Sequence, residues 1–146
     1  MSGFWGYFRT RLDAKGRINV PAKIRKNLRP EDQDTFILIR GTEKYISMHP
    51  LSRWEETMER IRQQVKNAQD MKIVIRRLMY QASEQTIDRQ GRLNIPAELI
   101  EYAELDGDVF IIGTVTRLEI WNPRNFSMDV EGNEDRFRQL AVNFEI

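Results

Sequence analysis

The chain of 146 residues contains no cysteine and one histidine, His49. Without cysteine there is no disulfide, no thiolate nucleophile and no cysteine zinc site. The longest apolar runs are only four residues, at 36–39 and 109–112, whereas a membrane-spanning helix needs about 20. Residues 1–20 also lack the apolar core of a secretory signal. These absences predict a soluble cytoplasmic protein that does not bind a membrane.

The motifs of the common enzyme classes are missing as well. There is no glycine-rich nucleotide loop, no G-x-S-x-G and no H-E-x-x-H. His49 has no acidic cluster at metal-ligand spacing beside it, and the acid pairs Glu55–Glu56 and Asp106/Asp108 are typical of solvated helix and loop positions. The sequence therefore predicts no catalytic residue, no metal site, no cofactor and no small-molecule substrate, which means that the protein is not an enzyme.

Charge is plentiful but segregated along the chain. The 23 Lys and Arg nearly balance the 22 Asp and Glu, so the net charge is only +1. Residues 1–30 carry +7, residues 31–59 carry −4, residues 60–92 carry +5 and residues 93–146 carry −7. A nearly neutral chain with such segments can present a basic face to a polyanion while its acidic segments lie elsewhere.

An internal repeat organises the chain. The segment 13–22 (DAKGRINVPA) recurs at 88–97 (DRQGRLNIPA), with six of ten positions identical at an offset of 75. Gly41-Thr42 recurs as Gly113-Thr114, and Pro50 recurs as Pro123. We therefore expect two copies of one unit, over residues 1–67 and 82–146, joined by a connecting segment over residues 68–81.

Each copy has the same order of predicted elements. Alternating apolar and polar residues flank the turns 13–16 and 88–91, which predicts a hairpin in each copy. Short helices follow Pro21 and Pro96, two strands follow each of them, and amphipathic helices follow Pro50 and Pro123. The predicted strands span residues 35–40, 44–48, 108–113 and 117–121, and residues 71–80 favour a helix over a strand. Because one unit cannot cover both faces of its own sheet, we expect the copies to interleave in a pseudo-symmetric α+β barrel.

Basic side chains concentrate on the first hairpin and the helix after it. They are Arg9, Arg11, Lys15, Arg17, Lys23, Arg25, Lys26 and Arg29, and Asp13 is the only acid among them. DNA phosphate would relieve their mutual repulsion, although a merely solubilising surface is the alternative interpretation.

Two smaller sets of residues carry alternatives of their own. Arg17 and Arg92 can pair with Asp13 and Asp88, four residues earlier, and an arginine oriented in this way can still meet a guanine edge or a phosphate. Three aromatic residues near the first hairpin could stack on bases, but we expect them in the core; they are Trp5, Tyr7 and Phe8.

The two D-x-x-G-R turns, followed by NVPA and NIPA, resemble those of the MraZ family of bacterial transcriptional regulators, which have two SpoVT-AbrB-type halves. The likeness runs from Tyr7 to about Leu140. It implies an α+β fold of two tandem AbrB-like, swapped-hairpin β-α-β units that form a pseudo-two-fold β-barrel flanked by helices. It also implies a repressor of the division and cell-wall gene cluster, including its own promoter, that binds tandem short repeats of double-stranded DNA as a ring-shaped, nucleoid-associated oligomer.

The motifs and the charge together define the candidate site. The candidate DNA-binding residues are Arg9, Arg11, Lys15, Arg17, Lys23, Arg25, Arg89 and Arg92, and the turn-forming residues are Asp13, Gly16, Asp88 and Gly91. Since the helix after the first turn is basic and its counterpart carries Glu98, Glu101 and Glu104, we expect the first copy to meet DNA. The second copy would then serve the barrel and the subunit contact. The alternatives are an antitoxin-like interaction module and a structural ring that does not bind DNA.

Overall fold

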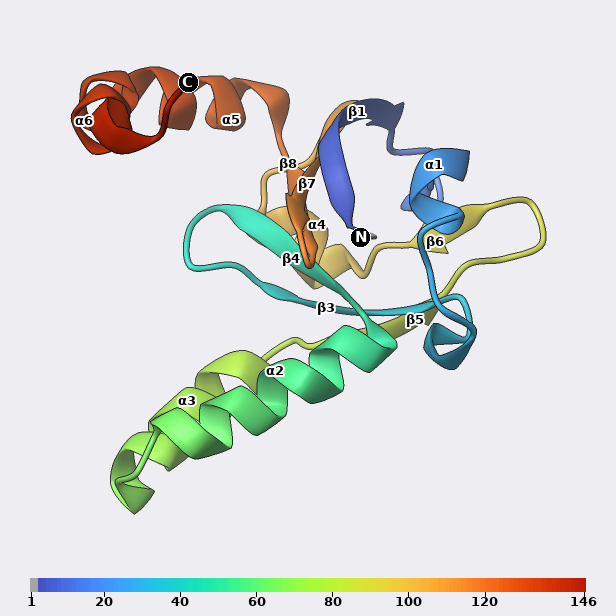
Figure 1. Cartoon of the computed structure of the whole chain (residues 1–146). Helices are drawn as coiled ribbons and strands as arrows, with labels where there is room; N and C mark the ends of the chain where they lie inside the picture. Colours follow the sequence, from blue (N-terminus) through green and yellow to red (C-terminus); the bar gives the residue numbers. More distant parts are fainter. Residues whose placement is uncertain (1–2) are drawn as a thin grey trace.

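The computed structural model describes residues 3–146, and its architecture is α+β, as the sequence predicts (Figure 1). The strands are β1 (Phe4–Arg11), β2 (Arg17–Asn19), β3 (Thr35–Arg40), β4 (Tyr45–Pro50), β5 (Ser83–Thr86), β6 (Arg92–Asn94), β7 (Asp108–Val115) and β8 (Leu118–Trp121). The α-helices are α1 (Ala22–Arg25), α2 (Leu51–Gln64), α3 (Ala68–Met79), α4 (Ala97–Tyr102), α5 (Pro123–Gly132) and α6 (Glu134–Leu140). Two 3-10 turns, η1 (Pro30–Asp32) and η2 (Ala141–Asn143), complete the described elements.

Six strands form one antiparallel sheet in the order β1-β7-β8-β4-β3-β5. The two halves of the chain exchange their first strands, because β1 pairs with β7 of the second half and β5 pairs with β3 of the first. The ladder between β4 and β8 joins the halves at the centre. This arrangement has the expected pseudo-symmetry, but over residues 3–146 the sheet is not closed into the expected barrel, since β1 and β5 remain as its two edges.

The remaining strands, β2 and β6, pair with each other in a separate two-stranded ribbon. Within the described residues, β1 and β2 form no ladder. The backbone N–H of Asp13 donates to the carbonyl of Arg17 (2.8 Å), but this hydrogen bond of the turn does not continue into a pair of strands. The prediction of a hairpin within each copy is therefore wrong for the strands. The reason is burial: Ile18 of β2 and Leu93 of β6 face each other in the ribbon, and both are buried in the common core.

The core lies between the ribbon and the large sheet, and it draws apolar residues from both halves. Figure 1 shows α1 beside β6 at the right of the view, with the α2–α3 pair and the α5–α6 pair extending to the left. The two helical pairs therefore lie away from the ribbon.

Most predicted elements form close to their predicted bounds. The strands at 35–40 and 108–113 appear as β3 and β7, and the segment 71–80 lies largely within α3. Pro21, Pro50 and Pro96 stand at the N-cap positions of α1, α2 and α4, where their missing N–H leaves no hydrogen bond unmade.

The carboxyl-terminal segment differs from its prediction in burial. The sequence predicts an amphipathic helix after Pro123, and an amphipathic helix is expected to pack its apolar side against the rest of the fold; α5, α6 and η2 do form there. Phe126 packs against Phe110 and Trp121, but the apolar side chains beyond it, including Phe137 and Leu140, are exposed. The amphipathic pattern is therefore real, but the described residues leave its apolar side largely uncovered.

Candidate nucleic-acid interface

The first turn is built around the carboxylate of Asp13. One carboxylate oxygen accepts hydrogen bonds from the backbone N–H groups of Lys15 and Arg17 (2.9 Å each), and the other accepts from Nε of Arg17 (2.9 Å). Gly16 has a φ of 79°, a left-handed conformation that glycine adopts without steric cost. The turn therefore fixes the Arg17 side chain through its Nε, while the Lys15 side chain is exposed to solvent.

The second turn has the same construction. Asp88 accepts from the backbone N–H groups of Gln90 and Arg92 (2.9 Å each) and from Nε of Arg92 (3.0 Å), and Gly91 has a φ of 81°. In both turns the hydrogen bond from the backbone N–H of the arginine is the main cause that lowers the pKa of the aspartate, and the arginine side chain lowers the pKa further. Both carboxylates are therefore ionised at neutral pH and orient their arginines continuously.

The ribbon between the turns has one apolar and one polar face. Side chains alternate along a strand, and directly opposed residues share a face. Arg17 lies opposite Asn94 and Asn19 lies opposite Arg92, so these four side chains form the outer face, which we call the ribbon face. Ile18 and Leu93 form the inner face. The two arginines occupy diagonal positions, which in an antiparallel pair are about 7–8 Å apart.

Two members of the ribbon face, Asn19 and Asn94, are absent from the candidate residues that the sequence predicts. Both are exposed, although each lies within a short strand next to buried residues. The available signal was their identity in both copies of the repeat, at a position that the alternation places outward. A search for positive charge passes over it, because asparagine carries none.

The exchange of strands also places α1 against the turn of the other half. The guanidinium Cζ of Arg25 lies 3.3 Å from the position that a Cβ would take at Gly91, and its Nε donates to the carbonyl of Val20 (3.0 Å). At the pseudo-symmetric position of the first turn, Ile100 of α4 lies 3.3 Å from the Cβ position of Gly16. The basic helix α1 therefore lines the second turn, and the acidic helix α4 lines the first. The expectation that only the first half binds DNA assumed the opposite arrangement, in which the basic helix lies beside the first turn.

The remaining candidate cations lie in other surroundings. Arg9 and Arg11 alternate with Thr10 on β1 and lie on its opposite face from Asn19, since the Thr10 hydroxyl donates to the carbonyl of Asn19 (3.2 Å). Arg11 pairs with Asp108 (2.8 Å), and the guanidinium of Arg9 lies 5.7 Å from the Phe110 ring centroid. The structure therefore does not gather all eight amino-terminal cations around one turn.

The other members of that set are on or after α1. Lys23 and Lys26 are exposed on α1 and at its C-cap, and Lys23 lies beside Trp5 and Phe8 of β1, whereas Arg29 pairs with Glu56 of α2 (3.2 Å). Arg89 is exposed at the tip of the second turn. The cations near the ribbon face are therefore Lys15, Arg17, Arg25, Arg89 and Arg92, and we call these five the ribbon cations.

The three aromatic residues at the start of β1 divide between surface and core. Phe8 packs against the core, as expected. Trp5 and Tyr7 are 56% and 60% exposed, so their expected burial is wrong. Tyr7 contacts the edge of Phe110, on the same side of β1 as Arg9 and away from the ribbon.

These features suit the interface to binding a backbone polyanion. A two-stranded ribbon has the dimensions that the major groove of B-DNA admits, about 12 Å wide, and Arg and Asn side chains can each form paired hydrogen bonds with base edges. Among residues 3–146, no group of three or more acidic or histidine residues is placed to hold a metal ion. Nor is any described helix both long and apolar enough to cross a bilayer.

Comparison with known proteins gives one consistent result. The family model described as "MraZ protein, putative antitoxin-like" matches residues 4–75 and 78–141. A relative named "Transcriptional regulator MraZ" from Natranaerobius thermophilus is 38% identical over 146 residues, covering 98% of this chain and 99% of its own. Another of the same name, from Halothermothrix orenii, is 30% identical over 142 residues, covering 97% and 96%. The chain, with a D-x-x-G-R turn at each end of one ribbon, therefore belongs to the MraZ family.

Proposed function

We propose that the protein is a DNA-binding transcriptional regulator, not an enzyme, and that it holds double-stranded DNA with the ribbon face and the ribbon cations. The observation that carries this proposal is the pairing of β2 with β6, which brings the turns of both repeat copies to one surface. The names of its relatives support the assignment to transcription.

Each part of the interface has a distinct role in this proposal. Lys15, Arg89 and Arg25 contact phosphates, which supply most of the affinity and no sequence information. Arg17 and Arg92, held by their aspartates, and the two asparagines of the ribbon face read base edges. Each good paired contact contributes about 1–3 kcal/mol of discrimination between bases. Arg9, Arg11 and Lys23 reach DNA only where it extends past the ribbon.

The family resemblance extends the proposal to the target and the cell. We infer a repressor of the division and cell-wall gene cluster that binds tandem repeats in its own promoter and associates with the nucleoid. The two halves correspond to tandem AbrB-like units over residues 1–67 and 82–146, with 68–81 as the connection. The exchange of β1 and β5 between halves is the feature that supports this correspondence.

Self-association into a ring is part of the same proposal. The apolar residues of α5, α6 and η2 are exposed, including Phe137, Leu140, Val142 and Phe144. On the α2–α3 pair, Ile73 and Met79 are exposed as well. Contacts between such unlike surfaces of neighbouring copies close into rings or continue as filaments. Because both helical pairs lie away from the ribbon, assembly through them leaves every ribbon face available to consecutive DNA repeats.

A binding titration tests the proposal. A labelled duplex from the region upstream of the gene is titrated with the wild type, Arg17→Ala, Arg92→Ala, the double variant and Arg62→Ala as the matched control. Arg62 is an exposed arginine of α2 that pairs with Glu59. Because both turns line the ribbon face, we expect each single variant to weaken binding at least tenfold and the control to match the wild type. Equal affinity of the double variant and the wild type would refute the proposal.

The description of the family model also names antitoxin-like proteins, and the exposed apolar side of α5 and α6 is a surface that a protein partner could cover. An antitoxin-like module is therefore the second candidate function. It predicts that the same titration detects no DNA binding and that Phe137→Ser abolishes capture of a protein partner.

A further inference from the structure

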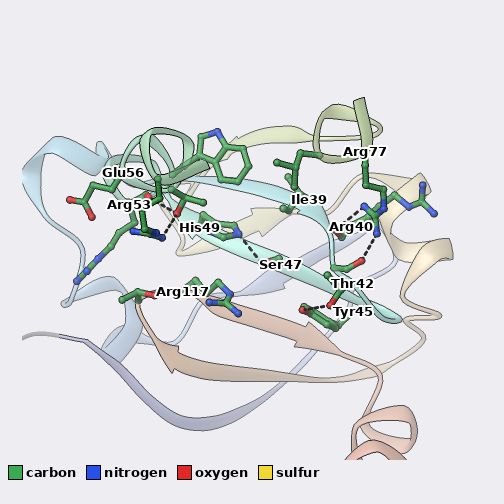
Figure 2. Close-up of a pocket in the computed structure, with 16 residues that line it drawn as sticks. Ile39, Arg40, Thr42, Tyr45, Ser47, His49, Arg53, Glu56, Arg77 and Arg117 are labelled. Carbon is green, nitrogen blue, oxygen red and sulfur yellow. Dashed lines mark hydrogen bonds between the residues drawn. The ribbon is translucent and has the colours of Figure 1, made fainter. Parts of the chain in front are cut away.

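A cavity of about 300 Å³ lies on the far side of β4 from the core, between α2, α3 and the β7–β8 turn. Its floor is formed by Ser47 and His49, which are 5% and 6% exposed although they are polar. Oγ of Ser47 and Nε2 of His49 are 2.8 Å apart. Figure 2 shows these two residues on β4 at the middle of the cavity, with Arg53 to one side, Arg77 to the other and Arg117 across from them.

Among the described residues, five arginines and a single carboxylate, that of Glu56, line this cavity. Two of the arginines are already engaged: Arg77 donates to the carbonyl oxygens of Arg40 and Gly41, and Arg40 stacks over the ring of Tyr102 (4.4 Å). Glu56 pairs with Arg29, outside the cavity.

The other three arginines have no counterion within the part of the chain that the structure describes. Arg53, Arg60 and Arg117 appear in no ion pair among residues 3–146, and the only side-chain bond that Arg60 donates goes to the Thr57 hydroxyl (3.1 Å). Positive charge in a recess with low-dielectric walls concentrates the potential and attracts anions. Burial, together with the smaller effect of the charges of Arg117 and Arg60, lowers the pKa of His49 to about 4. The imidazole on the floor is therefore neutral at pH 7 and can donate or accept a hydrogen bond.

The walls between the cations are apolar. Ile39, Trp54 and Leu78 line the cavity, and the Trp54 ring packs edge to face against His49. A cavity of this volume is at the lower end of the range for small-molecule sites, about 300–1,000 Å³. Arginine guanidinium groups bind phosphate oxygens with paired, charge-assisted hydrogen bonds. We propose that this cavity is a binding site for a small phosphate-bearing molecule with an apolar or aromatic body, separate from the DNA interface.

The position of the site gives it a route to the DNA interface. Arg77 donates to the carbonyl of Gly41, to which the hydroxyl of Tyr102 also donates (2.7 Å). Tyr102 ends α4, the helix whose Ile100 touches Gly16 in the first turn. Arg77 also donates directly to the Tyr102 hydroxyl (3.5 Å), so a ligand that shifts Arg77 would act one contact away from α4. We expect bound ligand to change the affinity for DNA, although binding itself does not depend on this coupling.

Calorimetric titration with phenyl phosphate, inorganic phosphate and phenol tests the site on the full-length protein. Phenyl phosphate should bind more tightly than inorganic phosphate, because only its ring reaches Trp54 and Leu78, and uncharged phenol should not bind. The double variant R60Q/R117Q should weaken binding by about tenfold for each arginine removed. The control R62Q/R124Q removes the same charge from exposed positions on α2 and α5 and should bind as the wild type does.

Phosphate could also bind at the ribbon, so the variant R17Q is included and should retain phenyl phosphate binding. The His49 ring resonances should shift on titration in the wild type and remain unmoved in R60Q/R117Q. Three results would overturn the proposal. They are the absence of saturable binding at millimolar phenyl phosphate, equal binding by the wild type and R60Q/R117Q, and loss of binding in R17Q alone. A change of oligomeric state in R60Q/R117Q without phosphate binding would assign the cavity to a neighbouring copy instead.

Discussion

The salt dependence of DNA binding can be calculated from the ribbon cations. Each phosphate that a protein neutralises contributes about −0.9 to the slope of log K against log salt concentration. With Lys15, Arg25 and Arg89 on phosphates, and Arg17 and Arg92 on bases, the slope for one protomer is about −2.7. Affinity then falls about 40-fold between 50 mM and 200 mM salt. If all five ribbon cations contact phosphates, the slope is nearer −4.5.

Fluorescence anisotropy on a single duplex across a series of salt concentrations measures this slope. The decisive variant is Arg25→Gln, because the exchange of strands places this α1 residue against Gly91 of the second turn. It should reduce the magnitude of the slope by about 0.9, and its effect should be non-additive with Arg92→Gln and additive with Lys15→Gln. Arg62→Gln on α2 should leave the slope unchanged. A wild-type slope shallower than −1, or an unchanged slope in Arg25→Gln, would show that the ribbon cations do not bind DNA phosphates.

Three further predictions concern the scaffold that holds the interface. The pKa of His49 is 6.5 in the unfolded chain and about 4 in the folded protein, so the unfolded state binds more protons between these two pH values. The free energy of unfolding should therefore fall by about 3 kcal/mol as the pH drops from 6.5 to 4. Urea titrations of His49→Gln should show a smaller decrease over the same pH range. Gly16→Ala should destabilise the protein by about 1–2 kcal/mol in thermal unfolding, because φ of Gly16 is positive and the new Cβ would contact the carbonyl of Ile95. The control Gly132→Ala should not destabilise the protein, because the space around its new Cβ is open. Leu93→Ala should lower the free energy of unfolding by about 2–5 kcal/mol, because this ribbon residue is fully buried. A smaller loss of stability would show that the ribbon does not depend on the core.

Much of the fold can be predicted from the sequence, because the repeat is clear and the residues that mark its turns and helix starts act locally. The aspartate and glycine of each turn and the prolines before α1, α2 and α4 act within a few residues, so pattern alone locates these elements. The connecting helix α3 also follows from its composition. These features require no knowledge of which strand pairs with which.

The partners of the strands could not be predicted, because pairing depends on contacts between residues that are distant in the sequence. Nothing local in β2, which is three residues long, indicates that Ile18 meets Leu93 and not a residue of β1. The expected gathering of eight cations rested on the assumption of a local hairpin. The exchange of strands sends Arg9 and Arg11 to the other face of β1 and brings Arg25 to the second turn.

The polar members of the ribbon face were missed for a different reason. Charge identifies a basic surface, but a side chain that recognises bases need not carry charge, and Asn19 and Asn94 carry none. Likewise, the cavity beneath α2 could not be foreseen, because its arginines come from β3, α2, α3 and the β7–β8 turn, which only the assembled fold brings together.

DNA is proposed to lie on the ribbon and to reach Arg9, Arg11 and Lys23 only where it extends past it. Backbone amide resonances followed during a titration with duplex DNA show directly where DNA lies. The largest shifts should fall on residues 13–19 and 88–94 and on Arg25, while α2, α3, α5 and α6 remain near their free positions. Shifts confined to those helices, with the ribbon unchanged at saturating DNA, would show that DNA does not bind the ribbon.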